Sequence, residues 1–401
     1  IIGNVPHLRF PEFSGEWEEH TLSEYLEFKN GLNPDAKRIG SGLPFISVMD
    51  ILSEGVINYD NIRGKVNATE KEIECFGVKD GDLLFQRSSE TLEDVGRANV
   101  YMDNRTAIYG GFVIRGRKIG NYDPLFFKYL LATPLARKRT CRMGAGAQHF
   151  NIGQEGLSKI SLYFPSIEEQ RKIAEFLSLI DERIATQNKI IEDLKKLKSA
   201  ISKYLFARKD LLETTICLSN IATLKNGYAF QSGKYNALGK WKILTITNVP
   251  GERYINDEDC NCIINLPNDI QDHQVLKEGD ILISLTGNVG RVSLCKNGNY
   301  LLNQRVGLLQ LAKNVNQEFL YQILSSQRFE NSMIACGQGA AQMNIGKGDV
   351  ENYVLPYSSN GNNILFAAKI LHSYDECIIN ELRRLTLLTM QKQYLLTQMF
   401  I

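Results

Sequence analysis

Apolar and polar residues alternate along this chain with two different periods. Short runs such as PFISVMDI at 44–51, GDLLFQR at 81–87 and GDILISL at 279–285 are apolar or alternating and are bounded by Gly, Asn and Asp, which is typical of strands. The stretches 123–139 and 316–333 instead carry apolar residues at i, i+3 and i+4 behind an Asp or Asn, which predicts a helix in each. Strands and helices mix within the same segments, so the expected fold class is α+β.

Two later stretches change to the heptad spacing of a coiled coil. The predicted seam of the first consists of Ile173, Leu177, Ile180, Ile184, Gln187, Ile191, Leu194, Lys198, Ile201 and Leu205. The predicted seam of the second consists of Leu371, Tyr374, Ile378, Glu381, Leu385, Leu388, Lys392, Leu395 and Met399. Each seam has two polar interruptions, and the interruptions fall at equivalent places.

The polar interruptions predict how the two helices pair. Antiparallel packing can set Gln187 opposite Lys392. The same register sets Lys198 opposite Glu381, so the arrangement closes on itself, and polar pairs in a seam specify register. We therefore expect an antiparallel rod of about 43 Å, at 1.5 Å per residue, with a globular module at each end and a rough two-fold axis between them.

Short motifs recur in the same order in the two halves of the chain. VKDGDLLF at 78–85 returns as LKEGDILI at 276–283, and GAGAQHFNIG at 144–153 returns as GQGAAQMNIG at 337–346. The offset drifts only between about 193 and 198 residues, which indicates one module of roughly 150 residues, duplicated with small loop insertions. The predicted segments are a first module at 1–166, a central helix at 167–210, a second module at 211–360 and a C-terminal helix at 361–401.

Composition narrows the class of protein. The 401 residues exceed one ordinary core, and the formal net charge is only +1. The eight cysteines are scattered, and Cys260 and Cys262 lack a second pair or a nearby His, so reduced thiols are expected rather than a zinc site. No apolar run is long enough for a membrane, and the start does not resemble a signal peptide, so we expect a cytoplasmic protein. The chain does not begin with Met, and we expect the natural N-terminus to be missing or processed.

Basic residues gather in the same part of both modules, although the whole chain is nearly neutral. Two similar modules at a fixed spacing suit duplex DNA, whose half-sites repeat about every 34 to 36 Å, and basic groups contact phosphates while polar groups read base edges. The candidate DNA contacts are, in the first module, Gln86, Arg87, Ser88, Arg97, Arg115, Arg117, Lys118, Arg137, Lys138, Arg139, Arg142, Gln148 and His149, and, in the second, Ser284, Thr286, Asn288, Arg291, Asn303, Gln304, Arg305, Gln342 and Lys347.

Enzyme motifs are missing from the sequence. An adenine methyltransferase needs an Asn/Asp-Pro-Pro-aromatic loop, and no two of the ten prolines are adjacent. The Gly-rich stretches at 144–146 and 287–290 do not continue into a nucleotide-binding fingerprint. Glu27 and Lys29 lack the upstream Asp of a metal nuclease, and the five His residues form no arrangement with Ser or Cys. We therefore predict no catalytic residue and no metal site.

The boundary between the first module and its helix resembles the specificity subunits of type I restriction–modification systems. In that family a Gly-rich Gln-Asn-Ile segment precedes a Pro, then Glu-Gln, then an Ile/Leu seam that ends in Asp. The matching residues are Pro165, Glu169, Gln170, Ile173, Leu177 and Asp181. LRFPEF followed by Trp17 and Leu22, and NQRVGLL at 303–309, are also similar to the family. The second boundary departs from it, because no Glu-Gln follows Pro356.

The resemblance implies a protein without catalysis of its own. Each module would be a target recognition domain that reads one half of an asymmetric, bipartite DNA site, and the helices would set the gap. Two methyltransferase subunits would use S-adenosylmethionine to methylate adenine, and restriction–translocase subunits would use ATP and Mg²⁺; this chain itself would bind no cofactor. The alternative is a scaffold that binds only proteins, and the salt dependence of DNA affinity would distinguish the two.

Overall fold

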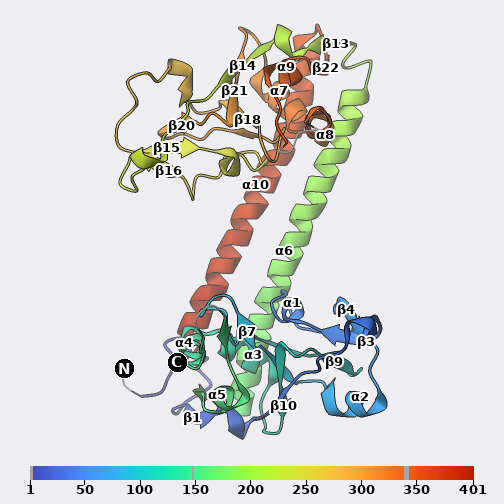
Figure 1. Ribbon diagram of the computed structural model, residues 1–401, viewed down its shortest axis with the longest axis vertical. Coiled ribbons are helices and arrows are strands. Elements are labelled where there is room, and N and C mark those ends of the chain that lie inside the picture. Colours follow the sequence, from blue (N-terminus) through green and yellow to red (C-terminus); the bar gives the residue numbers. More distant parts are fainter. Residues whose placement is uncertain (1–2, 147–148, 338–342) are drawn as a thin grey trace. The chain divides into compact units, whose positions relative to one another are not determined.

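The computed structural model describes residues 3–146, 149–337 and 343–401 (Figure 1). The chain divides into two compact units, one of Ile1–Asn188 with Arg384–Ile401 and one of Lys189–Arg383. Among the described residues, no helix is long and apolar enough to cross a bilayer. No group of three or more His, Cys, Asp or Glu within those ranges is placed to hold a metal ion.

The first module contains two four-stranded sheets, each with its own neighbour order. One has the order β2 (Leu26–Asn30), β10 (Val113–Lys118), β6 (Leu83–Gln86), β8 (Ala98–Val100), and the other has the order β4 (Gly64–Val66), β3 (Ile39–Ile46), β9 (Ala107–Tyr109), β5 (Gly77–Val78). Two short pairs are β1 (Glu18–Thr21) with β12 (Ser161–Phe164) and β7 (Ser88–Ser89) with β11 (Phe150–Asn151). The helices are α1 (Val48–Ile51), α2 (Glu70–Phe76), α3 (Pro124–Ala132), α4 (Pro134–Arg142) and α5 (Gln154–Ser158).

The second module repeats the order of both four-stranded sheets and one of the two short pairs. Its sheets are β14 (Ala222–Asn226), β21 (Val306–Leu311), β18 (Ile281–Ser284), β19 (Val292–Leu294), and β16 (Asn261–Ile263), β15 (Trp241–Leu244), β20 (Tyr300–Leu302), β17 (Val275–Leu276). The short pair is β13 (Thr214–Cys217) with β22 (Val354–Tyr357), and the helices are α7 (Gln317–Leu324), α8 (Gln327–Cys336) and α9 (Lys347–Glu351). β3 runs parallel to β9, as β15 runs parallel to β20, and all other named pairs are antiparallel. The α+β fold class and the duplication are confirmed.

The repeated Lys-Asn-Gly motif has a steric cause. A Cβ on Gly31 would lie 2.1 Å from the carbonyl oxygen of Gly110, and a Cβ on Gly227 would lie 2.1 Å from that of Asn303. In both modules the end of the first sheet strand touches the turn that leads into the central strand, β10 or β21. Only glycine fits at this approach of two backbones.

The two predicted module helices are each broken in two. Pro134 follows Thr133, which caps α4 through its hydroxyl, so the single helix expected over 123–139 becomes α3 and α4. Proline removes a backbone donor and disfavours the α conformation of the residue before it. In the second module Ser326 caps α8 in the same way, and the helix predicted over 316–333 ends first at Leu324.

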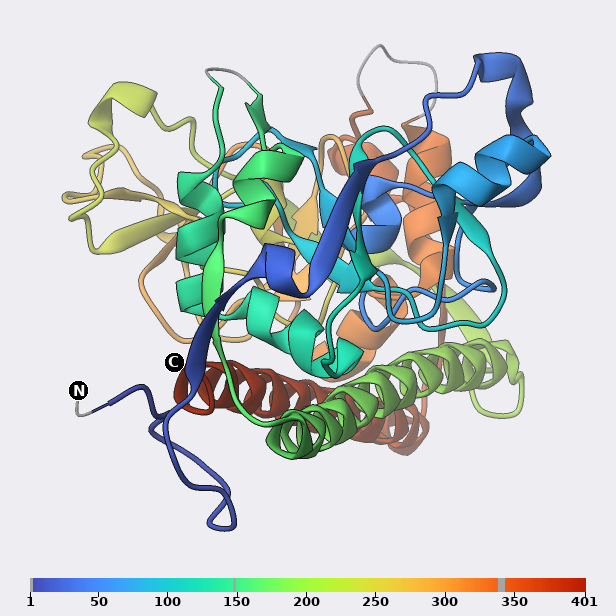
Figure 2. The same cartoon turned by 90° about the horizontal axis from the view of Figure 1, so that it is seen from below.

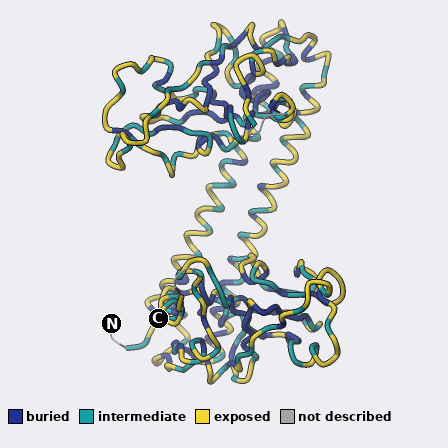
Figure 3. The backbone as a smooth tube through the Cα atoms, viewed as in Figure 1, coloured by how far each residue is buried: buried dark blue, intermediate teal, exposed yellow. Residues whose placement is uncertain are grey.

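The two long helices are α6 (Ile167–Ala207) and α10 (Gly361–Gln398), and each contributes residues to both units. In the first unit Leu177 of α6 and Leu395 of α10 join the core of the first module, with Trp17 and Phe126. Figure 2 shows the ribbons of the two long helices along one side of the first module. In the second unit Leu205 and Leu371 join the core of the second module. The heptad helices are thus confirmed. The seam residues that join the module cores are buried, whereas others, such as Leu194 and Leu388, are half-buried. Figure 3 shows exposed and less exposed residues alternating along both long helices.

Candidate nucleic-acid interface

Loops that are far apart in the sequence meet at the same place in both modules. In the first, Ser88 of β7 pairs with Asn151 of β11, and its hydroxyl donates to the Asn151 side chain. In the second, Thr286 forms the equivalent antiparallel bridge to Asn344. The structure therefore brings the predicted readers at 86–97 next to the segment that carries His149. Gln148 and Gln342, also predicted as readers, lie outside the described residues.

A third turn joins this site and carries different side chains in the two modules. The Arg87 amide donates to the carbonyl of Phe112 at 2.9 Å, and the Leu285 amide donates to the carbonyl of Arg305 at 3.0 Å. The strand register places Phe112 and Arg305 at equivalent positions. Phe112 is 68% exposed, which is unusual for a phenylalanine, and Arg305 is exposed. The sequence analysis did not include Phe112, although aligning IYGGFV at 108–113 with LLNQRV at 301–306 would have placed it there.

Several predicted readers shape these loops from inside. Gln86 is buried, and its amide donates to the carbonyl of Ser88 at 2.9 Å. Ser284, at the equivalent position, is also buried and donates to the carbonyl of Thr286 at 3.3 Å. Asn303 is buried and accepts from the backbone amide of Arg305 at 3.1 Å. These three side chains hold the turns on which exposed neighbours sit.

The prediction of Arg115 and Arg117 as DNA contacts is wrong, because both are held inside the first module. Arg115 is 6% exposed and donates to the carbonyl of Gly77 at 2.9 Å. Arg117 donates to the same carbonyl at 2.6 Å and forms an ion pair with the buried Asp82 at 3.0 Å. Burial raises the pKa of the Asp82 carboxyl, and the two arginines oppose that rise. A guanidinium held by internal acceptors cannot reach a phosphate.

Other predicted basic residues divide into anchored and exposed groups. Arg137 donates to the carbonyls of Glu93 and Val95, and Arg139 binds Glu19 at 2.8 Å. Lys118 is exposed, but its ammonium donates to the carbonyl of Tyr122. The predicted contacts with exposed or half-exposed side chains are Arg87, Ser88, Arg97, Lys138, Arg142, His149, Thr286, Asn288, Arg291, Gln304, Arg305 and Lys347. Of these, Arg97 pairs with Asp94 at 2.6 Å, Arg291 with Glu330 at 3.5 Å and Lys347 with Glu351 at 3.7 Å.

The seam lysines pair with aspartates rather than with the predicted partners. In the first unit Lys392 binds Asp181 at 2.5 Å, and in the second unit Lys198 binds Asp375 at 2.5 Å. These contacts replace the expected pairing of Lys392 with Gln187 and of Lys198 with Glu381. Asp181 and Asp375 flank their seams, and flanking positions commonly carry the charges that bridge paired helices. Both pairs are copies of one contact, in which a lysine of one long helix binds an aspartate of the other.

A buried ionic cluster joins the second module to the two long helices; we call this contact the second junction. Arg253, from the loop after β15, forms a two-pronged contact with Glu318 of α7, at 2.9 and 2.6 Å, and donates to Asp375 at 2.9 Å. Gln322 also donates to Asp375, at 2.6 Å. The Arg253 and Asp375 side chains are only 8% and 7% exposed. One carboxylate therefore ties the module to both long helices.

The first junction is the equivalent contact of the first module with the two long helices. Its central aspartate is Asp181, and the groups that donate to it differ from those around Asp375. The Tyr129 hydroxyl donates to Asp181 at 2.8 Å, and the Lys392 ammonium lies over the Tyr129 ring. Gly55 stands at the loop position that Arg253 has in the second module, and it has no side chain to offer. Lys128 supplies the positive charge instead, and its ammonium donates to the carbonyl of Gly55. Burial lowers the pKa of Lys128 to about 8; Asp181 opposes this shift, and Lys392 adds to it.

The family of the chain is decided by comparison with known sequences. The model of the family described as "Type I restriction modification DNA specificity domain" matches residues 14–196 and again residues 213–389. The chain belongs to this family. It carries two copies of the domain, one for each module, and it shares the order and duplication of the type I restriction–modification specificity subunits.

Relatives of this specificity family match along most of the chain. The MjaVIII type I restriction enzyme specificity subunit of Methanocaldococcus jannaschii is 25% identical over 81% of this chain and 78% of its own length. The putative MjaX specificity subunit of the same organism is 24% identical over 88% of this chain and 84% of its own length.

Solved structures of this specificity family share the fold. The crystal structure of the type I restriction–modification S subunit from M. genitalium has a TM-score of 0.58, with 17% identity over 99% of each chain. A structure described in connection with complex assembly and conformational transition of the type I restriction–modification system has a TM-score of 0.57, with 14% identity over 96% of this chain and 97% of that one.

Lys128 of the first junction gives this specificity subunit a testable pH dependence. Its folded pKa of about 8 lies below the value of about 10.4 in an unfolded chain. Between these values the unfolded chain holds a proton that the folded chain lacks, so this group makes the free energy of unfolding rise with pH. In urea unfolding at about pH 8 and pH 10, the wild type should gain about 2 kcal/mol relative to Lys128→Met. A difference between the two proteins that does not change with pH would contradict the assignment.

Proposed function

We propose that this chain reads a bipartite, asymmetric DNA sequence, one half with each module, as the non-catalytic subunit of a type I restriction–modification complex. The long helices set the gap between the two halves. Two methyltransferase subunits supply S-adenosylmethionine chemistry on adenine, and restriction–translocase subunits supply ATP- and Mg²⁺-dependent cleavage. The chain itself binds no cofactor in this proposal.

The observation that carries the proposal is a turn with the same backbone hydrogen bond in both modules but with different exposed side chains. At the same turn position the first module presents Phe112 and the second presents Arg305. Arginine makes two-pronged hydrogen bonds to guanine in the major groove, whereas an aromatic ring contacts a thymine methyl group. A shared frame with different contact groups suits two readers of different base sequences.

The runner-up is a scaffold that binds proteins only. In a salt titration, log affinity for duplex DNA should fall with log salt by about 0.9 for each phosphate contacted. Exposed basic side chains near the reading turns, such as Lys138 and Arg142, favour the DNA reading. A flat response of the assembled complex would favour the scaffold.

A base-resolution methylation map of DNA, from cells that express the chain with its methyltransferase subunit, tests the proposal. We expect a split motif with a fixed gap. Exchange of residues 211–360 for another module should change one half only. Arg305→Ala should relax one base position in that half by about ten- to a hundredfold, and Phe112→Ala should affect only the other half. Methylation without sequence preference, in an intact complex, would reject the two-reader function.

A further inference from the structure

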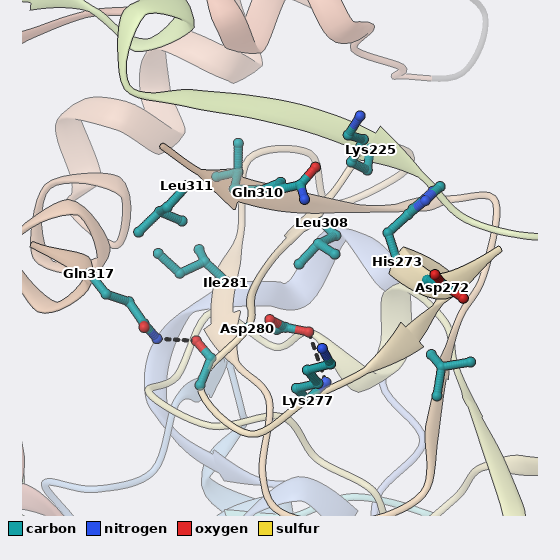
Figure 4. Close-up of a pocket in the computed structure, with 13 residues that line it drawn as sticks. Lys225, Asp272, His273, Lys277, Asp280, Ile281, Leu308, Gln310, Leu311 and Gln317 are labelled. Atoms are coloured by element: carbon teal, nitrogen blue, oxygen red, sulfur yellow. Dashed lines mark hydrogen bonds between the residues drawn. The ribbon is translucent and has the colours of Figure 1, made fainter. Parts of the chain in front are cut away.

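A cavity of about 430 Å³ opens in the second module between β14, β17, β18 and β21 (Figure 4). Its apolar wall includes Ile281 and Leu308, and its polar lining includes Asp280, Gln310 and Gln317. This volume falls within the range of about 300–1,000 Å³ that small-molecule sites occupy. Strands of both four-stranded sheets of the second module line the cavity.

Two arginines occupy the equivalent place in the first module. The strand pairings align β10 with β21, so that Leu308 stands at the position of Arg115 and Gln310 at the position of Arg117. Asp280 corresponds to Asp82, which follows the same Asp/Glu-Gly turn. The second module therefore retains the carboxylate and has lost both guanidinium groups.

The acceptors that hold these arginines are retained. In the first module the carbonyl of Gly77 accepts from both arginines, and Asp82 pairs with Arg117. The equivalent of Gly77 is Val275, which has the same register against its neighbouring strand and lines the cavity. The second module thus has a carboxylate and a backbone carbonyl at the positions that bind a guanidinium in the first module, about two hundred residues earlier in the chain.

Asp280 pairs with no cationic side chain among the described residues, although the charge of Lys277 acts on it and opposes the rise of its pKa. Its carboxylate accepts the backbone amide of Lys277 at 2.8 Å and makes no ion pair. Burial raises the pKa of the Asp280 carboxyl. Figure 4 shows Lys225 and His273 at the rim pointing away from it, and His273 contacts the carbonyl of Asn226 at 3.0 Å instead. A half-buried carboxylate that forms no ion pair favours a cationic ligand.

We infer that this cavity binds a guanidinium group, held by the Asp280 carboxylate and the backbone at Val275. The planar fork of a guanidinium matches a carboxylate with two parallel hydrogen bonds, which a primary ammonium cannot do. The group belongs either to an arginine of a protein partner or to a small free guanidinium compound. This inference concerns a different surface from the reading turns and does not depend on DNA binding.

Titration of the full chain with agmatine, followed by ligand-observed NMR, tests the inference. Putrescine, which has the same carbon chain but only amines, is the matched control ligand. We expect agmatine to bind more tightly than putrescine, and Asp280→Asn to weaken agmatine binding by about tenfold or more. Asp272→Asn, at the rim of the same cavity, should leave it unchanged. Equal binding of the two ligands, or equal effects of the two substitutions, would overturn the inference.

A second variant keeps the test independent of any folding defect in Asp280→Asn. Gln310→Arg restores the residue of the first module on an exposed position, and it should fill the cavity and abolish agmatine binding while the chain stays folded. Continued binding to this variant would also overturn the inference. Addition of the methyltransferase subunit separates the two sources. Displacement of agmatine indicates a partner arginine, and retained binding indicates a free compound.

Discussion

Replacement of Asp375 by alanine is expected to lower the free energy of unfolding by about 3–5 kcal/mol. The Asp375 side chain is 7% exposed and accepts from Lys198, Arg253 and Gln322. Without Asp375, Lys198 and Arg253 remain in a poorly hydrated place with one carboxylate fewer. Removing one partner of a buried ion pair commonly lowers the free energy of unfolding by this amount. Urea unfolding of the full chain, followed by circular dichroism, measures the effect.

Asp181→Ala is the matched control, because it removes the equivalent carboxylate of the first unit. The Asp181 side chain is 25% exposed, so water can replace part of what Lys392 and Tyr129 lose, and the expected effect is about 1 kcal/mol. A double variant with Lys198→Met should be less destabilised than the sum of its single changes, since Lys198 contacts Asp375 directly. Equal effects of the two alanine variants would contradict the role of the buried cluster.

Gly227→Ala is expected to destabilise the second module by about 1–3 kcal/mol and to weaken reading of one half-site. The added Cβ would lie 2.1 Å from the carbonyl oxygen of Asn303, and a backbone atom cannot turn aside as a side chain can. The turn that carries Gln304 and Arg305 must therefore shift. Chemical unfolding measures the stability, and the methylation map shows which half of the motif becomes less stringent.

Gly233→Ala serves as the control for the loss of a glycine. No atom lies within 4 Å of a Cβ built at Gly233, so its replacement should change stability by less than about 0.5 kcal/mol. Gly31→Ala should reproduce the effect of Gly227→Ala in the first module, because its Cβ meets the carbonyl of Gly110 at the same distance. If Gly227→Ala behaves like Gly233→Ala, the close approach at this turn does not constrain the reading site.

The duplication, the strands and the long helices follow from the sequence because they depend on local periods. The alternation in 81–87 and 279–285 predicted the inner strands β6 and β18, and the heptads predicted α6 and α10. The helices predicted over 123–139 and 316–333 were too long, although Pro134 marked one of the breaks. A period indicates which face of an element is buried, but it indicates the ends of that element less well.

The apolar seam alone was not enough to predict the axial register of the two helices. The polar interruptions Lys198 and Lys392 pair with Asp375 and Asp181, which the seam pattern did not include. Several registers satisfy an apolar seam equally well. The choice depends on side chains of the modules, such as Arg253, which reach the same aspartate from a distant part of the chain.

The sequence by itself determined that this protein has two copies of one α+β module, each followed by a heptad helix, and it determined the family through the order of its motifs. Only the tertiary structure decided which charges face solvent. Arg115 and Arg142 look alike in a basic run, yet Arg115 is buried against the carbonyl of Gly77 while Arg142 is exposed. Whether a basic side chain is buried or faces solvent depends on the acceptors that folding places beside it, because a buried charge is tolerated only where it has hydrogen-bond partners.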